Sequence, residues 1–250
     1  MTTKRTILVT GATGTLGVPT TAQLREAGHD VLALSRRTGP GLVTGDLLSG
    51  TGLTSAMDGV GTVVHLATGK DDVRAAATLL DAADRAGVHH LVLISIVGID
   101  DIPLGYYKQK QEVERLVSGS DVPHTILRAT QFHSFVERLF TAQRWLPVVL
   151  APAFDLQPIA VQEVARRLVE LAGGAPAGRV PDIGGPARRP VADLAAAWAA
   201  ARGVRRPLVP LRLPGRTFEG YRAGHQLVPG PEYGVVTFEE HLAASTGVVT

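Results

Sequence analysis

A glycine-rich turn near the amino terminus constrains the fold of this chain more than any other feature. The apolar run Ile7–Thr10 is typical of a buried strand, glycines follow at 11, 14 and 17, and a helical run begins at once. The first glycine permits a tight turn, the second lets a phosphate approach the backbone, and the third allows close helix packing. The helix amino terminus adds free N–H groups and a positive dipole end. The turn therefore predicts a dinucleotide site contacted by Gly11, Thr13, Gly14, Thr15, Leu16 and Gly17, with a tight ligand-free turn as the alternative.

The end of the second expected strand indicates which dinucleotide binds. This strand closes on Ser35, Arg36 and Arg37, and no acidic residue follows before Asp46. Sites for NAD usually place a carboxylate there to bind the ribose 2′-hydroxyl, whereas arginine suits the 2′-phosphate of NADP. We therefore predict NADP(H), bound in part by Ser35, Arg36 and Arg37. The alternative is a solvated arginine pair that tolerates either cofactor.

Strand-like and helical segments alternate through the first half of the chain. The strand-like runs are almost continuously Val, Ile and Leu, which is typical of parallel strands covered on both faces. We expect an α/β fold, a Rossmann-type doubly wound parallel sheet. The expected strands span 6–10, 30–35, 42–45, 62–67, 90–95 and 124–128. The expected helices span 16–27, 54–57, 71–86 and 107–118.

The second half of the chain is less regular and richer in proline. Helices are still expected at 161–171, 191–201 and 238–244, and no repeat or low-complexity linker separates the halves. We therefore predict one domain over residues 1–250. Its core spans about 4–130, and a smaller carboxyl-terminal portion at about 131–250 covers the substrate.

The composition excludes several classes of protein. The absence of cysteine rules out disulfides and thiolate chemistry, and no His, Asp or Glu spacing suggests a metal site. No run approaches the roughly 20 apolar residues of a membrane helix, and the first strand leaves no room for a signal peptide. With a net charge of +2 and only 5% aromatic residues, nucleic-acid binding is not expected. We expect a soluble cytoplasmic protein with no membrane, nucleic-acid or metal partner.

Seven segments, in this order, resemble the short-chain dehydrogenase/reductase superfamily, specifically its atypical, NmrA-like NAD(P)H-binding branch. They are Thr10–Gly17, Gly45–Leu47, Val64–Ala67, Leu93–Gly98, Gly105–Lys110, Leu127–Phe132 and Gln157–Ile159. The likeness extends from about Lys4 to Ala244. It implies that the adenine lies beside Asp46 and Leu47. It also implies that Ala67, Thr68 and Gly69 line the cofactor beyond the fourth strand. It also implies that Ala129 and Phe132 border the nicotinamide.

Tyr106 and Lys110 form a Y-x-x-x-K pair on one face of an expected helix. An ammonium one turn away lowers the pKa of a phenol, which can then pass a proton to a carbonyl oxygen. The resemblance implies these catalytic roles, with Lys110 also binding the cofactor ribose; a purely structural pair is the alternative. Ser95 is the candidate third member, although better-known members carry this serine one or two residues later. Tyr107 is another phenol, but Gln111 rather than lysine follows it by four residues.

The expected substrate wall follows the sixth strand. It begins at Gln131–Phe135 and continues with Phe140 and Trp145, an apolar and aromatic lining suited to a flat ligand. We name His133 and Phe135 as substrate contacts, with His133 as a substitute proton donor. Ordinary helix packing is the alternative, and His65 is interpreted as a core histidine.

Two functions follow from these predictions. The first is an NADPH-dependent oxidoreductase that reduces a carbonyl, a quinone or a related small apolar substrate, with Tyr106 as proton donor assisted by Lys110. The second is a non-catalytic NADP(H)-sensing regulatory protein of the NmrA type. In either case we expect a monomer or a homodimer.

Overall fold

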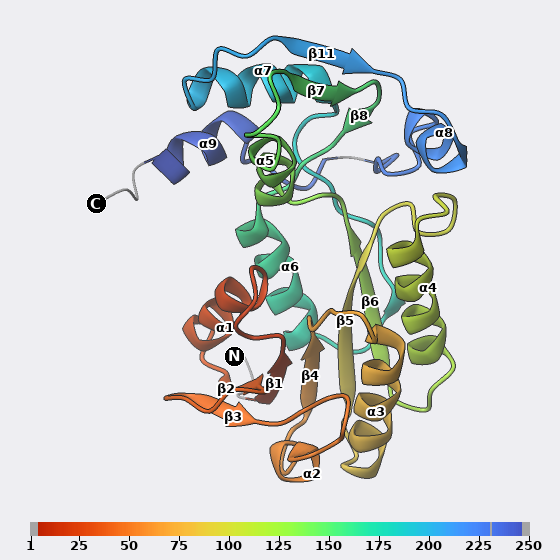
Figure 1. Ribbon diagram of the computed structural model, residues 1–250. Helices are drawn as coiled ribbons and strands as arrows, with labels where there is room; N and C mark the ends of the chain where they lie inside the picture. Colours follow the sequence, from red (N-terminus) through yellow and green to blue (C-terminus); the bar gives the residue numbers. More distant parts are fainter. Residues whose placement is uncertain (1–4, 231, 247–250) are drawn as a thin grey trace. The chain divides into compact units, whose positions relative to one another are not determined.

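The structure, a computed structural model, describes residues 5–230 and 232–246 (Figure 1). The chain forms two compact units, each assembled from separate stretches of sequence. The first unit comprises Met1–Ser95, Lys108–Arg128 and Val161–Pro181. The second comprises Ile96–Tyr107, Ala129–Ala160 and Asp182–Thr250.

A seven-stranded sheet organises the first unit, in the order β3-β2-β1-β4-β5-β6-β9. The central strand β1 (Thr6–Thr10) pairs in parallel with β2 (Asp30–Ser35) on one side and β4 (Thr62–His65) on the other. The order therefore reverses at β1, and open parallel sheets bind ligands at the carboxyl ends of the strands at such a point. The remaining strands are β3 (Leu42–Thr44), β5 (His90–Ile96), β6 (His124–Ala129) and β9 (Gly178–Arg179).

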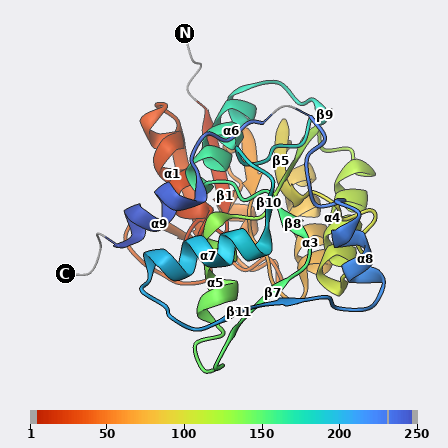
Figure 2. The same ribbon diagram turned by 90° about the horizontal axis from the view of Figure 1, so that it is seen from above.

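Helices cover both faces of this sheet, which confirms the predicted Rossmann-type fold. The helices α1 (Gly17–Glu26) and α6 (Val161–Gly173) lie on one face, and α3 (Asp72–Arg85) and α4 (Gly105–Ser118) lie on the other (Figure 2). A short helix, α2 (Leu53–Ala56), precedes β4. Burial from both faces explains why the strands carry so little polar sequence. The core between the sheet and its α3–α4 face includes Leu8, Val63, Leu79, Leu91, Val113 and Ile126.

The segment Val161–Pro181 returns to the first unit, although the sequence placed it in the carboxyl-terminal portion. Its helix α6 buries an apolar face, and Gln23 on α1 donates a side-chain hydrogen bond of 3.1 Å to the carbonyl of Gln162. Beyond α6, Arg5 donates to the carbonyl of Gly174 at 3.0 Å, and β9 extends the sheet beside β6. The boundary between the units is therefore crossed several times.

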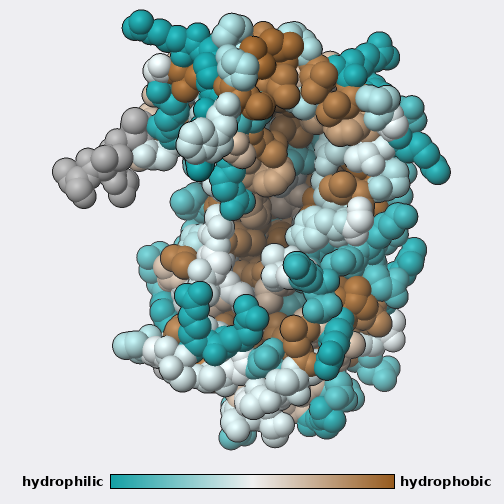
Figure 3. All heavy atoms as spheres, viewed as in Figure 1, coloured by the Kyte–Doolittle hydropathy of each residue, from teal (hydrophilic) through white to brown (hydrophobic). Residues whose placement is uncertain are grey.

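Short strands and helices build the second unit. The strand β7 (Val149–Pro152) pairs in parallel with β11 (Leu208–Leu211), and β8 (Asp155–Leu156) pairs antiparallel with β10 (Arg189–Pro190). Its helices are α5 (His133–Thr141), α7 (Val191–Ala201), α8 (Arg216–Arg222) and α9 (Phe238–Thr246). Figure 3 shows hydrophobic side chains on the surface over β7 and β11. The core of this unit includes Val136, Phe140, Val149, Leu194, Trp198 and Leu242.

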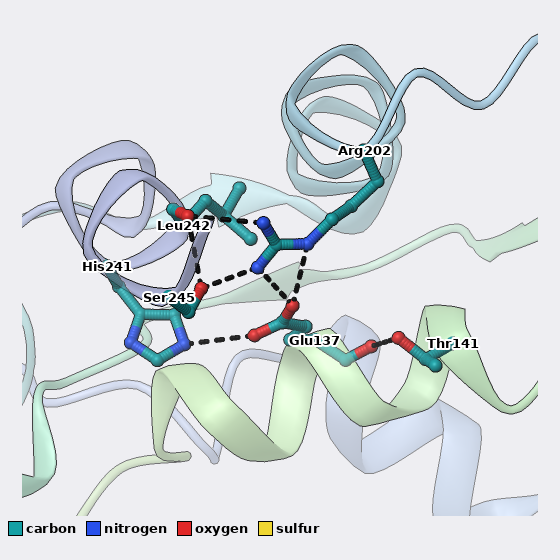
Figure 4. A network of polar contacts seen from close by, with 6 residues as sticks. All are labelled: Glu137, Thr141, Arg202, His241, Leu242 and Ser245. Atoms are coloured by element: carbon teal, nitrogen blue, oxygen red, sulfur yellow. Dashed lines mark hydrogen bonds and ion pairs between the residues drawn. The ribbon is translucent and has the colours of Figure 1, made fainter. Parts of the chain in front are cut away.

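A polar network joins three elements of the second unit, α5, the end of α7 and α9 (Figure 4). Glu137 accepts hydrogen bonds from Arg202 at 2.5 and 3.0 Å, and its other oxygen lies 3.2 Å from Nε2 of His241. Arg202 also donates to Ser245 and to the carbonyl of Leu242. The network fixes α9 against the rest of the unit, because the Glu137 carboxylate binds both Arg202, at the end of α7, and His241 on α9.

Several elements of the second unit were not expected from the sequence: α5, α8 and all four short strands. Each of these strands contains only two or four residues, and its hydrogen-bond partner comes from a distant segment. Local pattern alone could not predict them. Within the described residues, no helix is long and apolar enough to span a membrane.

Candidate functional site

The glycine turn after β1 is shaped by two glycines that have no room for a side chain. A Cβ on Gly11 would lie 2.7 Å from the backbone nitrogen of Ala67, and the φ of +66° at Gly11 also favours glycine. A Cβ on Gly17 would lie only 2.0 Å from the carbonyl oxygen of Gly11. These contacts bring the turn, the end of β4 and the start of α1 into direct contact.

Gly14 differs from the other two glycines. It is exposed, and the nearest atom to a Cβ added there is the Gly11 carbonyl oxygen at 3.2 Å. Thr13 and Thr15 are exposed beside it, whereas Leu16 is buried. The amino terminus of α1 also lacks a side-chain cap. The turn thus presents bare backbone at an uncapped helix amino terminus, which fits a dinucleotide pyrophosphate.

The residues predicted to choose the cofactor lie at the ends of β2 and β3. Ser35 accepts a hydrogen bond from the backbone of Arg37 at 3.0 Å, and its carbonyl accepts from Gly45 at 2.9 Å. Arg36 and Arg37 are exposed, and no ion pair of either is present in the described part of the chain. Their guanidinium groups therefore remain available for an anionic ligand.

Asp46 has a local structural partner. Its carboxylate accepts the backbone N–H of Leu48 at 2.8 Å, which stabilises the turn after β3. Leu47 is partly buried and packs against the hydrophobic core of the first unit. Both residues lie one short turn beyond β3, on the same strand-end side as Ser35.

His65 and Thr10 connect β4 to β1. The Thr10 hydroxyl accepts the backbone N–H groups of Leu66 and Ala67, both at 3.2 Å, and lies 2.7 Å from Nδ1 of His65. Burial, together with a smaller effect of the nearby Lys110, lowers the pKa of His65 to about 3. The ring is therefore neutral at ordinary pH, and the Thr10 hydroxyl donates to Nδ1, leaving the ring hydrogen on Nε2. These contacts support the interpretation of His65 as a core histidine that positions the loop after β4.

The lysine of the Y-x-x-x-K pair lies in a buried ion pair. Nζ of Lys110 is 3.0 Å from Oδ2 of Asp72, and the two side chains are 6% and 5% exposed. Asp72 also accepts the Thr68 hydroxyl at 2.8 Å and the backbone N–H of Gly69. The Asp72 carboxylate thus joins Lys110 to the loop Ala67–Gly69, which is predicted to line the cofactor. Asp72 was not among the residues identified from the sequence, because nothing in its local pattern points to Lys110.

The two adjacent tyrosines at the start of α4 have different surroundings. Tyr106 is 41% exposed, whereas Tyr107 is buried and its hydroxyl lies 3.1 Å from that of Tyr221. Burial, reinforced by the nearby Tyr221 hydroxyl, raises the pKa of Tyr107 well above its ordinary value. Tyr107 therefore retains its proton, and Tyr106 is the more accessible phenol. Tyr106 belongs to the second unit and Lys110 to the first, one helical turn apart on α4.

Ser95 lies near the end of β5 and is 3% exposed. Its hydroxyl has no hydrogen-bond partner among the described residues. A buried hydroxyl is costly to leave unpaired, so this atom fits a contact to a bound molecule.

The remaining predicted residues lie in the second unit. Ala129 ends β6, and Phe132 immediately precedes α5. His133 is buried, lies 3.0 Å through Nε2 from the carbonyl of Val236, and stacks on His241 at 5.3 Å between ring centroids. Phe135 is 42% exposed. His133 therefore has a structural role in holding α9, and a direct substrate contact from it stays a prediction.

Clusters of titratable side chains give no indication of a metal centre. Within residues 5–230 and 232–246, no group of three or more His, Asp or Glu residues is arranged to hold a metal ion. The second unit does contain an open cavity of about 520 Å³, lined in part by Phe154, Val191, Tyr221 and Leu227. Its lining is mostly apolar, with prolines and alanines in the wall, and it also includes the charged residues Asp155 and Arg222.

Comparison with known proteins identifies similar sequences. A family model described as NAD(P)H-binding matches residues 11–172. The (4-alkanoyl-5-oxo-2,5-dihydrofuran-3-yl)methyl phosphate reductase of Streptomyces griseus is 36% identical over 141 residues. That match covers 51% of this chain and 48% of the reductase, so this chain spans about half the length of its relative.

Solved structures share the fold at low sequence identity. The NADPH-dependent quinone oxidoreductase of Escherichia coli, in complex with NADPH, has a TM-score of 0.79 and 18% identity, over 96% of this chain and 99% of its own. A nucleoside-diphosphate-sugar epimerase from Staphylococcus aureus has a TM-score of 0.77 and 17% identity, over 95% and 99% of the two chains. These similarities show a common architecture.

Proposed function

The chain belongs to the NAD(P)H-binding family, and from that premise we propose that it is an NADPH-dependent oxidoreductase of the short-chain dehydrogenase/reductase type. Its acceptor is a carbonyl, a quinone or a related small apolar molecule. The observation that carries the proposal is the turn at Gly11–Gly17, where two glycines allow no side chain and Gly14 exposes bare backbone. The reductase and the quinone oxidoreductase among the similar proteins support the reaction class.

The choice of NADPH rests on the end of β2. Arg36 and Arg37 are exposed there, and a guanidinium binds a phosphate through paired hydrogen bonds that an acidic residue would oppose. The pyrophosphate lies against Gly14 and the amino terminus of α1, and the adenine lies beside Asp46 and Leu47. Ala67, Thr68 and Gly69 line the next part of the cofactor.

The catalytic roles belong to residues at the ends of β5 and β6 and on α4. When bound, NADPH supplies a hydride to the acceptor. Tyr106 donates its hydroxyl proton to the acceptor oxygen, and Ser95 donates a hydrogen bond to the same atom. Lys110 holds the ribose and favours loss of the Tyr106 proton, while Ala129 and Phe132 border the nicotinamide. His133 and Phe135 contribute to the substrate wall.

The test measures NADPH consumption with a panel of ketones and quinones. The wild type should consume NADPH with at least one acceptor, and the Tyr106→Phe variant should lose about 100-fold or more in kcat while retaining NADPH binding. The Tyr107→Phe variant is the matched control, because Tyr107 is buried and remains protonated. Full activity in Tyr106→Phe would remove Tyr106 from the mechanism.

A non-catalytic NADP(H)-sensing regulator of the NmrA type is the second candidate. The observation that favours it is the Lys110–Asp72 ion pair, because an ammonium already paired with a carboxylate is less available to assist proton transfer from Tyr106. This function predicts tight NADPH binding with no consumption by any acceptor in the panel. Turnover that depends on Tyr106 would exclude it.

A further inference from the structure

The turn between α5 and β7, residues 142–148, exposes large apolar side chains. Trp145 is 83% exposed, Leu146 is 41% exposed, and Leu139 near the end of α5 is 42% exposed. Val209, on the strand β11 that pairs with β7, is 37% exposed. Single exposed apolar residues are common on soluble proteins, but a group that includes an almost fully exposed tryptophan indicates an interaction surface.

The turn is held in place although Trp145 and Leu146 are exposed. The Gln143 side chain donates to the carbonyl of Leu150 at 3.2 Å and accepts the backbone N–H of the same residue at 2.8 Å. Arg206, from the segment before β11, donates to the carbonyl of Gln143 and, at 2.9 Å, to that of Leu146. Trp145 therefore lies on an ordered turn, and contact with a partner does not require the turn to be ordered first.

The charged residues beside this turn are all arginines. The stretches 138–150 and 203–211, which the pairing of β7 with β11 joins, contain four arginines and no lysine or acidic residue. The whole chain, in contrast, has 25 basic and 23 acidic residues. The preceding acidic residue, Glu137, is already paired with Arg202 at 2.5 Å. The four arginines are Arg138, Arg144, Arg205 and Arg206.

This combination of side chains matches an anionic lipid surface in charge and in polarity. Arginine is attracted to acidic headgroups, tryptophan partitions to the bilayer interface, and leucine enters the acyl boundary. The guanidinium of Arg144 lies 5.1 Å from the ring centroid of Trp145, so a cation and an interfacial ring are adjacent. A second copy of this chain fits less well, because a two-fold interface centred here would bring arginines against arginines. Single-stranded nucleic acid would stack on the ring but offer the leucines no apolar partner.

We propose that this surface docks the protein onto a bilayer that contains anionic phospholipid. Trp145 and Leu146 enter the interface, and the arginines bind headgroup phosphates. Such docking needs no spanning helix and no long apolar run, which is why the composition did not predict it. The inference goes beyond the proposed reductase function and does not depend on it. The docking surface comprises Leu139, Trp145, Leu146 and Val209 with Arg138, Arg144, Arg205 and Arg206.

Co-sedimentation with vesicles tests the proposal on the whole chain. The protein should bind phosphatidylcholine vesicles that contain about 30% phosphatidylglycerol about tenfold or more tightly than vesicles of phosphatidylcholine alone, because each arginine is attracted to the anionic surface. Salt at about 0.5 M should weaken this binding by about tenfold or more, because it screens the charges. No binding to the anionic vesicles, or equal binding to both compositions, would overturn the proposal.

Two arginine pairs give a comparison that is matched in net charge. Arg144→Gln/Arg205→Gln should weaken binding to the anionic vesicles by about tenfold or more, since about fivefold is lost with each arginine. Arg85→Gln/Arg115→Gln is the control, at side chains of the first unit that are 68% and 66% exposed. This control should stay within about twofold of wild type, because its charges lie outside the docking surface. An equal loss in both double variants would show attraction by net charge alone and would exclude a defined docking surface.

Tryptophan fluorescence reports whether Trp145 itself meets the lipid. The chain has two tryptophans, and the other, Trp198, is only 4% exposed. Emission should shift to shorter wavelength when wild type binds the anionic vesicles, because Trp145 leaves water. Trp145→Phe keeps an apolar ring and should bind without this shift. The absence of a shift in vesicle-bound wild type would place the contact elsewhere and refute the proposal.

A serine substitution measures how much the ring contributes. Trp145→Ser should weaken vesicle binding by about tenfold or more, because it removes the largest apolar group of the surface. Val235→Ser is the control, since Val235 is 72% exposed in the same unit and lies outside the docking surface. Both variants should keep Tm within about 2 °C of wild type, because neither side chain is packed in a core. Unchanged vesicle binding by a folded Trp145→Ser variant would contradict the role of the ring.

Sedimentation velocity without vesicles distinguishes lipid docking from self-association. Wild type and Trp145→Ser should have the same oligomeric state, because the docking surface contacts lipid rather than a second copy. A wild-type oligomer that dissociates in Trp145→Ser would assign the surface to contacts between copies of this chain and would overturn the proposal.

Discussion

Nζ of Lys110 lies 3.0 Å from Oδ2 of Asp72, and both side chains are almost completely buried. The pair links α4 to the first residue of α3, and Asp72 also binds Thr68 and Gly69 in the loop after β4. The predicted ribose-binding lysine and the predicted cofactor loop therefore share one carboxylate. A change at Asp72 should affect both.

Replacing Asp72 by asparagine should destabilise the protein by about 3–5 kcal/mol, because it leaves the Lys110 ammonium buried without an opposite charge. Urea unfolding measures the loss. The Asp72→Asn/Lys110→Met double variant should lose clearly less than the sum of the two single variants, since each single change leaves one charge unpaired. Additive losses would show that the two groups do not depend on each other.

An exposed ion pair on the same helix provides the matched control. Glu112 and Arg115 lie 3.1 Å apart on α4, with side chains 46% and 66% exposed. Glu112→Gln should change the free energy of unfolding by less than about 1 kcal/mol, because water already solvates both charges.

The glycine turn predicts opposite results for two neighbouring substitutions. Gly17→Ala should lower Tm strongly, because its methyl group would lie 2.0 Å from the Gly11 carbonyl oxygen. Gly14→Ala requires a shift of only a few tenths of an ångström and should fold nearly as well as wild type. If the turn binds a pyrophosphate, Gly14→Ala should nevertheless raise the Kd for NADPH by about tenfold or more.

The Gly14 measurement distinguishes a ligand site from a ligand-free turn. NADPH binding is measured by fluorescence titration on variants whose Tm has been determined first. An unchanged Kd in a folded Gly14→Ala variant would contradict the predicted position of the pyrophosphate.

Arg36 and Arg37 should determine the preference for NADPH. Replacing both by alanine should raise the Kd for NADPH by roughly 10–100-fold, because charged hydrogen bonds to the 2′-phosphate are lost. Binding of NADH, which lacks this phosphate, should change by less than about threefold. The comparison is made by titrating each variant with both cofactors. An equal loss of affinity for NADPH and for NADH would indicate a role in folding or in pyrophosphate binding.

His65 should make the protein less stable in acid. Its pKa is lowered from the ordinary value of 6.5 to about 3, mainly by burial, so the unfolded chain takes up a proton below about pH 6.5 and the folded chain does not. Stability therefore falls as pH decreases, by up to about 1.4 kcal/mol per pH unit from this group. His65→Gln should reduce the slope of unfolding free energy against pH between about pH 4 and pH 6.

A second buried histidine provides an internal comparison. The pKa of His90 is lowered to about 4, again mainly by burial. His90→Gln should reduce the slope over the same range and have little effect below about pH 4. If His65→Gln left the slope as it is in wild type, the neutral, buried state of His65 would be wrong.

The sequence predicted the first unit more fully than the second. The bounds of β1 and β2 in the first unit, and of α7 in the second, agree with the expected ranges 6–10, 30–35 and 191–201. Their residues carry a local pattern, because a strand buried on both faces must be apolar throughout and a packed helix repeats its buried residues every turn. The strands β7, β8, β10 and β11 carry no such pattern, because each exists only through its distant partner.

Some features of the candidate site can likewise be predicted from the sequence, and others cannot. The glycine turn, Arg36-Arg37 and the Tyr106–Lys110 spacing could be predicted, because each depends on residues that are close in sequence. The ion pair of Lys110 with Asp72 could not, because burial and pairing arise from segments brought together by folding. The sequence by itself thus determined the fold class and the glycine-rich turn after the first strand. Only the tertiary structure decided which polar groups around them are already paired and which remain available to a ligand.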